Sequence, residues 1–155
     1  MRKALIVPLV LALVAVAAVL AAVASARPDS AKQHVVIEHK GNSFVLTPTS
    51  PGVVKSDRGA FASCCWTTRH VVVAGQRLEL DNPRLTLTGR NGTLELRNRI
   101  AFVDLPDKWA IFTGTWKVIG GTGAYSGLSG HGQVFGTATP GGYDRVSFLG
   151  FLTSK

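Results

Sequence analysis

Alternation of apolar and polar positions is clearest in residues 76–105, where it predicts antiparallel β-strands. Leu78 and Leu80 alternate with charged neighbours, and the same pattern returns in residues 84–88 and 93–97. Successive side chains of a strand point to opposite faces, so each run has one buried and one solvated face. This division is typical of antiparallel sheets, because parallel sheets are covered on both sides.

Turn signals divide the rest of the chain into similar short runs. Asn91-Gly92 is the strongest hairpin signal, because both residues tolerate positive φ. From His34 onward we count about nine or ten strands and no sustained helical period. Glycines spaced within the C-terminal strands allow sharp bending and favour a barrel over a sandwich. The sequence therefore predicts an all-β domain over residues 34–155, a closed antiparallel β-barrel of about eight strands.

The N-terminus carries the pattern of a secretory signal peptide over residues 1–26. Arg2 and Lys3 precede the almost wholly apolar run 4–24, and small residues lead to a cleavage site between Ala26 and Arg27. We expect a signal helix, a flexible linker over residues 27–33 and a secreted or extracytoplasmic protein. The alternative is an uncleaved membrane tether, because the apolar run is long enough to span a bilayer.

The chain is basic, but its charge is scattered. The formal net charge is +8, and it falls to +6 once Arg2 and Lys3 leave with the signal peptide. The sequence has no basic run, and its Lys and Arg residues fall on the polar phase of strands or in turns, as on a solvated surface. We therefore expect no nucleic-acid partner. A weak contact with anionic polymers or lipid headgroups of the cell envelope stays open.

The two cysteines, Cys64 and Cys65, are adjacent. Neighbouring strand residues point to opposite faces, so we expect one buried thiol and one half-exposed thiol. A vicinal disulfide is the alternative, which an oxidising compartment would favour. Two adjacent cysteines lack the spacing of a zinc site, and we expect no metal and no cofactor.

The most distinctive segment is GGTGAYSGLSGHG, residues 120–132. It is not a phosphate-binding loop, because its spacing is wrong and no helix pattern follows it. We interpret it as a structural corner in which glycines turn the chain while Tyr125 and Leu128 pack inward.

The run 116–127, WKVIGGTGAYSG, together with the following Gly130-His131-Gly132, resembles the strand–GGTG–aromatic motif of the allene oxide cyclase and dirigent-like barrels. The resemblance covers roughly 25 residues. It implies an eight-stranded antiparallel barrel, and in plant members such a barrel guides a cyclisation or a radical coupling without a cofactor. No catalytic residue of those families can be matched elsewhere in the chain, so none is transferred.

Three residues are the candidate ligand-binding set: Trp116, Tyr125 and His131. Glycine neighbours leave room for a small molecule beside His131, and the two aromatic residues flank the same motif. The alternative for the histidine is a surface or strand-end position. No pair of histidines has metal-ligand spacing, and the G-x-S-x-G nucleophile motif is absent from the sequence. A further set of aromatic residues either lines a ligand cavity or fills a small barrel: Trp66, Phe102, Trp109, Phe112, Phe135 and Phe148.

Three functions follow from this reading. The first is binding of a small apolar molecule in the barrel mouth. The second is a non-catalytic interaction module at the cell envelope, and the third is a cofactor-free cyclase or isomerase. The volume and polarity of the interior discriminate among them. The sequence carries no signal for an oligomeric state.

Overall fold

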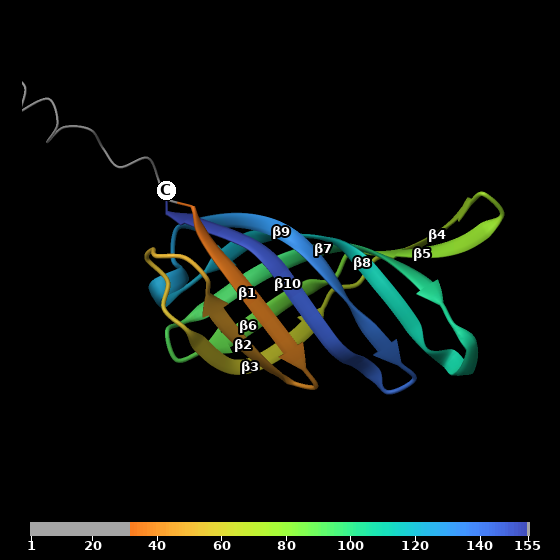
Figure 1. The fold of residues 1–155 in the computed structure, drawn as a ribbon, viewed down its shortest axis with the longest axis horizontal. Helices are drawn as coiled ribbons and strands as arrows, with labels where there is room; N and C mark the ends of the chain where they lie inside the picture. The colour runs from red at the N-terminus through yellow and green to blue at the C-terminus, as the bar shows by residue number, and fades with distance from the viewer. Residues whose placement is uncertain (1–31, 155) are drawn as a thin grey trace, which may run out of the picture.

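Ten strands form one antiparallel sheet, which curls until its wall closes (Figure 1). The computed structural model describes residues 32–154. The elements are β1 (Gln33–Lys40), β2 (Ser43–Pro48), β3 (Asp57–Cys64), β4 (Thr68–Val73), β5 (Gln76–Asp81), β6 (Arg84–Gly89), β7 (Thr93–Asp104), the 3₁₀ turn η1 (Pro106–Lys108), β8 (Ala110–Gly121), the 3₁₀ turn η2 (Gly123–Tyr125), β9 (Leu128–Thr139) and β10 (Gly142–Ser154).

Eight of these strands make the barrel. Their order is β7-β6-β3-β2-β1-β10-β9-β8, and β8 pairs back with β7 to close the wall. This confirms the predicted all-β fold and the closed antiparallel barrel of about eight strands. The two remaining strands, β4 and β5, form a hairpin that projects from one end of the barrel (Figure 1). The last three residues of β5 join the wall by pairing with β7.

The inward positions fill the body of the barrel. The largest fully buried side chain is Trp116, which is 1% exposed. It occupies space that the backbones of Gly132 and Gly150 leave open, because a Cβ atom at either glycine would lie within 2.7 Å of the indole. The interior void between Phe61, Leu85 and their neighbours is only about 10 Å³. The centre of this barrel is therefore a packed core and not a ligand chamber.

One end of the barrel is closed by side-chain hydrogen bonds. Gln33, at the start of β1, is 2% exposed, and its amide exchanges two hydrogen bonds with the backbone of Val54, at 2.7 and 2.8 Å. Tyr125, in η2, donates to the carboxylate of Asp57. The first contact fixes the β2–β3 loop and the second fixes η2. The interpretation of the GGTG segment as a structural corner is confirmed, because β8 ends there and Tyr125 packs inward.

Several sequence predictions fall on residues that lie outside the described part of the chain. These are the signal peptide 1–26, its cleavage site at Ala26 and Arg27, and most of the linker 27–33; β1 begins at Gln33. Within residues 32–154, no helix is both long and apolar enough to cross a membrane.

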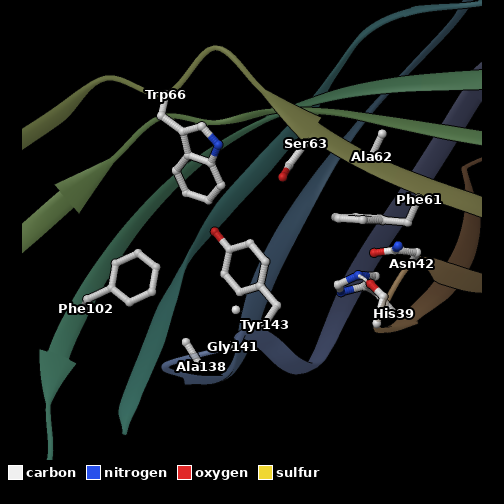
Figure 2. Close-up of a pocket in the computed structure, with 12 residues that line it drawn as sticks. His39, Asn42, Phe61, Ala62, Ser63, Trp66, Phe102, Ala138, Gly141 and Tyr143 are labelled. Carbon is white, nitrogen blue, oxygen red and sulfur yellow. Dashed lines mark hydrogen bonds between the residues drawn. The ribbon is translucent and has the colours of Figure 1, made fainter. Parts of the chain in front are cut away.

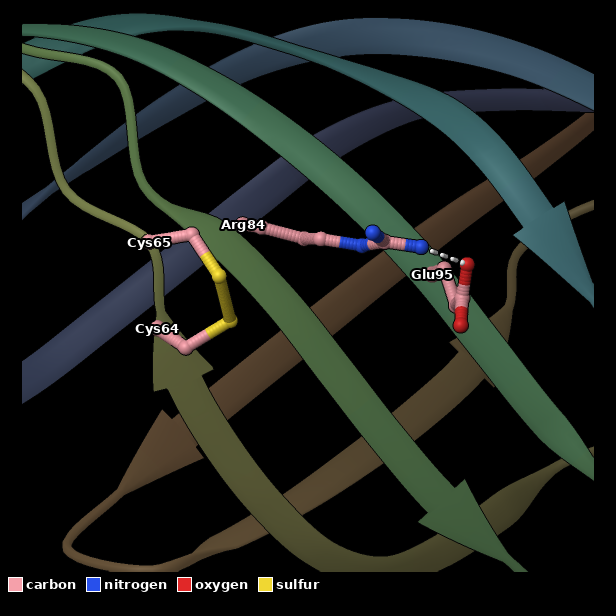
Figure 3. The surroundings of a disulfide bond; sticks show 4 residues. All are labelled: Cys64, Cys65, Arg84 and Glu95. Carbon is pink, nitrogen blue, oxygen red and sulfur yellow. Dashed lines mark hydrogen bonds and ion pairs between the residues drawn. A yellow bond between two sulfur atoms is a disulfide. The ribbon is translucent and has the colours of Figure 1, made fainter.

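The expectation for the cysteines is wrong. Cys64 and Cys65 form a vicinal disulfide, and both residues are exposed (Figure 3). The strand β3 ends at Cys64, and Cys65 has a φ of 59°. Cys65 therefore lies outside the strand, and the alternation of side chains between the two faces of β3 does not extend to it. Next to the disulfide, Arg84 forms an ion pair of 2.7 Å with Glu95 (Figure 3). Glu95 lies on the outer face, in agreement with the alternation over residues 93–97.

Candidate functional site at the barrel mouth

The end of the barrel opposite Tyr125 is open and forms a pocket of about 650 Å³, which we call the mouth pocket (Figure 2). It lies between the β1–β2 turn, the end of β3, the β9–β10 turn and the far half of β7. Five of its lining residues carry aromatic rings, and the others are small or polar. The lining residues are His39, Gly41, Asn42, Phe61, Ala62, Ser63, Trp66, Phe102, Ala138, Gly141, Gly142 and Tyr143.

Local strand geometry explains why His39 and Tyr143 reach this pocket. His39 follows Val35 and Ile37 at intervals of two along β1, so it shares their inward face. The turn after it contains Gly41 at a φ of 58°, which glycine adopts without strain. Tyr143 stands at the start of β10, where the register with β9 shifts between Tyr143 and Arg145. This irregularity re-aims the side chain toward the mouth.

The protonation of His39 follows from its contacts. Its Nε2 is hydrogen-bonded to the carbonyl oxygen of Gly41. Because a carbonyl can only accept, Nε2 carries the proton, and Nδ1 of the neutral ring is an acceptor. Burial lowers the pKa of His39 below its ordinary value, and the bond to Gly41 opposes this only in part. The ring stacks on Phe61 with 3.6 Å between centroids, and Nδ1 is buried with no hydrogen-bond partner among residues 32–154.

Tyr143 carries the second unsatisfied polar group of the mouth. Its hydroxyl is buried and finds no partner in the part of the chain that the structure describes. Burial raises the pKa of Tyr143 well above its ordinary range, and the charges of Asp81 and Glu79 raise it further. The phenol therefore stays protonated at physiological pH and can donate a hydrogen bond. A donor at Tyr143 and an acceptor at His39 thus belong to the same pocket, with 6.2 Å between their ring centroids.

Trp66 covers the mouth from the solvent side. It lies on the connection between β3 and β4, is 42% exposed, and stacks on Tyr143 with 5.7 Å between centroids. Figure 2 shows the hydroxyl of Tyr143 pointing toward the side where Trp66 and Ser63 lie, with Phe102 to the left of the ring in this view. The hydroxyl itself is shielded from solvent.

The structure places the three predicted ligand-binding residues in three different environments. Trp116 is in the packed core, where its Nε1 donates to the carbonyl of Leu149 at 3.3 Å. Tyr125 is buried at the closed end of the barrel. His131 is exposed on the outer face of β9 and packs edge-on against Phe151, with 4.4 Å between centroids. Trp116 and His131 both border a shallow groove on the outer wall, and Tyr125 lies apart from it.

Sequence reasoning missed His39, Tyr143, Trp66 and Phe102 as a group. The inward position of His39 could have been predicted, because it follows Val35 and Ile37 at intervals of two along the strand. Trp66 and Phe102 were among the aromatic residues predicted to line a cavity or fill the barrel, and both line the mouth pocket. Tyr143 had no such signal, because it reaches the others only when the barrel closes. Among residues 32–154 no group of three or more His, Cys, Asp or Glu side chains is arranged to hold a metal ion.

Comparisons with known proteins add no assignment. No family model matches the chain, and neither a curated protein nor a solved structure matches it.

Proposed function

We propose that the mouth pocket binds a small, mainly apolar molecule that carries one hydrogen-bond donor and one acceptor. The observation behind this proposal is the pair of buried, unsatisfied polar atoms, Nδ1 of His39 and the hydroxyl of Tyr143, in an aromatic pocket. A buried polar group without a partner costs about 1–3 kcal/mol. A ligand that pairs with both groups recovers this free energy, which favours the bound state.

The chemistry of the two groups specifies the ligand. A hydroxyl or N–H of the ligand donates to Nδ1 of His39, and a carbonyl or ether oxygen accepts from Tyr143. The rings of Phe61, Trp66 and Phe102 provide apolar walls suited to an aromatic or unsaturated body. The pocket volume of about 650 Å³ lies within the range of small-molecule sites, roughly 300–1,000 Å³. Because the core below is filled, the ligand stays at the mouth.

Tryptophan fluorescence tests the proposal. In a Trp109→Phe background, Trp66 is the exposed reporter and Trp116 remains as a buried internal reference. The mature protein is titrated with hydroxylated phenolic compounds and with oxygenated fatty-acid derivatives. We expect a saturable change of Trp66 emission with at least one ligand class, and about tenfold weaker binding in Tyr143→Phe, because one lost hydrogen bond is worth about 1.4 kcal/mol.

The matched control is His131→Phe, which changes a histidine on the outer wall and should leave the affinity unchanged. Two outcomes contradict the proposal. One is the absence of a saturable signal across both ligand classes. The other is saturable binding that His131→Phe weakens and that Tyr143→Phe and His39→Phe leave intact.

A cofactor-free isomerase or cyclase is the second candidate, and one observation favours it. The mouth holds a neutral imidazole acceptor and a neutral phenol donor, and the carboxylate of Asp81 acts on that phenol electrostatically. Such a pair can take a proton from one atom of a bound substrate and support charge at another. Turnover that is lost in His39→Gln while binding is retained would support this function; unchanged turnover would exclude it.

We also propose that the protein is exported, because its N-terminus has the pattern of a signal peptide. The resemblance to allene oxide cyclase and dirigent-like barrels is a separate proposal, which rests on the sequence of residues 116–132. Expression of the full chain in a secreting host, followed by N-terminal sequencing of the released protein, tests the export. We expect the mature chain to begin at Arg27. A protein that is retained with its first 26 residues supports the tether instead.

A further inference from the structure

The outer wall of the barrel carries two cations and a histidine, which the strand register brings into one row. Arg97 on β7 pairs with Lys117 on β8, and Lys117 pairs with His131 on β9. All three side chains are exposed. Adjacent strands are about 4.8 Å apart, so the row is about 10 Å long. Consecutive members of this row are 20 and 14 positions apart in the sequence, so they form no basic run there.

A second row lies beside the first. Arg99 pairs with Thr115, and Thr115 pairs with Gln133, again across β7, β8 and β9. The first row, with Arg99 and Thr115 of the second, borders a groove of about 300 Å³, which we call the basic groove. No acidic residue lines it in the part of the chain that the structure describes. Glu95, which lies on β7 beside Arg97, forms an ion pair with Arg84.

The neutral neighbours of the cations favour one kind of polyanion. Thr115 and Gln133 offer hydrogen bonds of the type that sugar hydroxyls form. Phe151, paired with His131 on β10, offers an aromatic face beside the row. Duplex DNA needs a larger basic surface, because specific modules bury at least about 600 Å² and contact many phosphates. A row about 10 Å long on a convex wall matches a narrow, flexible chain better.

We propose that the basic groove binds an acidic polysaccharide, with Arg97, Arg99 and Lys117 pairing with its carboxylate or sulfate groups. Arginine pairs with such groups through two parallel N–H donors, and lysine acts as a point charge. This surface is on the side wall and is separate from the mouth pocket, so a small ligand and a glycan chain can bind at once.

Binding of the mature protein to heparin and to polygalacturonate, over a series of salt concentrations, tests the inference. The variant Arg97→Gln/Arg99→Gln/Lys117→Gln is compared with Lys55→Gln/Arg77→Gln/Lys108→Gln, which removes the same charge from exposed residues elsewhere. We expect the first variant to lose about three units of the salt-dependence slope, since each ionic contact contributes about one. The second variant should keep the parent slope within about one unit.

Duplex DNA and vesicles containing phosphatidylserine serve as the other probes, at matched concentrations of negative charge. Weaker binding to both than to the two polysaccharides supports a glycan site. The inference is overturned if the control variant loses as much slope as the groove variant, because the attraction is then set by net charge. It is equally overturned if DNA or the vesicles bind through the groove residues as tightly as the polysaccharides do.

Discussion

The hydroxyl of Tyr125 donates to Oδ2 of Asp57 at 2.8 Å, and this bond joins residues 68 positions apart. Asp57 also accepts from the backbone N–H groups of Arg58, Arg90 and Asn91. One carboxylate therefore ties the start of β3 to the β6–β7 turn and to η2. These are three of the segments that meet at the closed end of the barrel, where the residue Asp57 is only 5% exposed.

Loss of this bond should destabilise the barrel. We expect Tyr125→Phe to lower the free energy of unfolding by about 1.5–3 kcal/mol, because the bond is buried and its acceptor is charged. Urea denaturation followed by circular dichroism measures the change.

Tyr143→Phe is the matched control, since it removes a buried hydroxyl that has no partner among residues 32–154. It should leave the stability unchanged or raise it slightly, because the removed group carries only a desolvation penalty. Equal losses in the two variants would mean that the bond between Tyr125 and Asp57 contributes nothing specific.

Two groups should make the stability fall as the solution becomes acidic. Burial lowers the pKa of His39 below 6.5, so the unfolded chain binds a proton first as the pH falls. Stability is fully present above pH 6.5 and decreases below it. Burial raises the pKa of Asp57, but hydrogen bonds from Tyr125 and the three backbone N–H groups lower it more. Its contribution is present above pH 3.8 and is lost as the pH falls further.

Urea midpoints measured from pH 8 to pH 2.5 check this order of events. In His39→Phe the loss near and below pH 6.5 should disappear, and in Asp57→Asn the loss below pH 3.8 should disappear. Identical pH profiles for the parent and both variants would contradict both assignments.

The sequence predicted the barrel better than it predicted the site, for a physical reason. The alternation around Leu85, Leu94 and Leu96 predicts which face of each strand is buried, and all three side chains are buried in the structure. Closure of the wall then decides which end stays open, and this depends on pairings between distant strands. Tyr125 and Tyr143 have similar sequence surroundings rich in glycine, but one seals the closed end and the other lines the mouth.

The glycines are a second case in which the sequence predicted the fold but not the individual contacts. Spaced glycines favoured a barrel from the sequence, but only the structure shows what each one makes room for. At Gly150 a Cβ atom would lie 2.3 Å from the backbone oxygen of His131 and 2.6 Å from Cζ2 of Trp116. A backbone oxygen and a packed indole cannot both move aside at low cost.

Gly150→Ala should therefore destabilise the barrel by about 1–3 kcal/mol, the usual effect of overpacking a core. Gly141→Ala is the control, because the nearest atom to a Cβ there is 3.6 Å away. It should be neutral or stabilise by up to about 1 kcal/mol through a smaller entropy of the unfolded chain. Thermal denaturation of the two variants beside the parent measures both effects; a Gly150→Ala protein as stable as the parent would show that the interior tolerates extra volume.

The vicinal disulfide should affect the mouth pocket more than the fold. Cys64 and Cys65 are adjacent, so their bond closes a minimal loop and restricts the unfolded chain by only about 1 kcal/mol. Reduction removes the constraint that keeps Cys65 at a φ of 59°, a conformation that non-glycine residues adopt at a cost. Trp66, the next residue, stacks on Tyr143, so its indole should become more mobile.

We therefore expect dithiothreitol to shift and weaken the emission of Trp66 in the Trp109→Phe background, while the unfolding free energy changes by about 1 kcal/mol or less. Both cysteines are exposed, so the reductant reaches them in the folded protein. Cys64→Ser/Cys65→Ser should reproduce the reduced spectrum without dithiothreitol, and its spectrum should not respond to the reagent. A loss of several kcal/mol on reduction would give the disulfide a structural role; unchanged Trp66 emission would separate it from the mouth pocket.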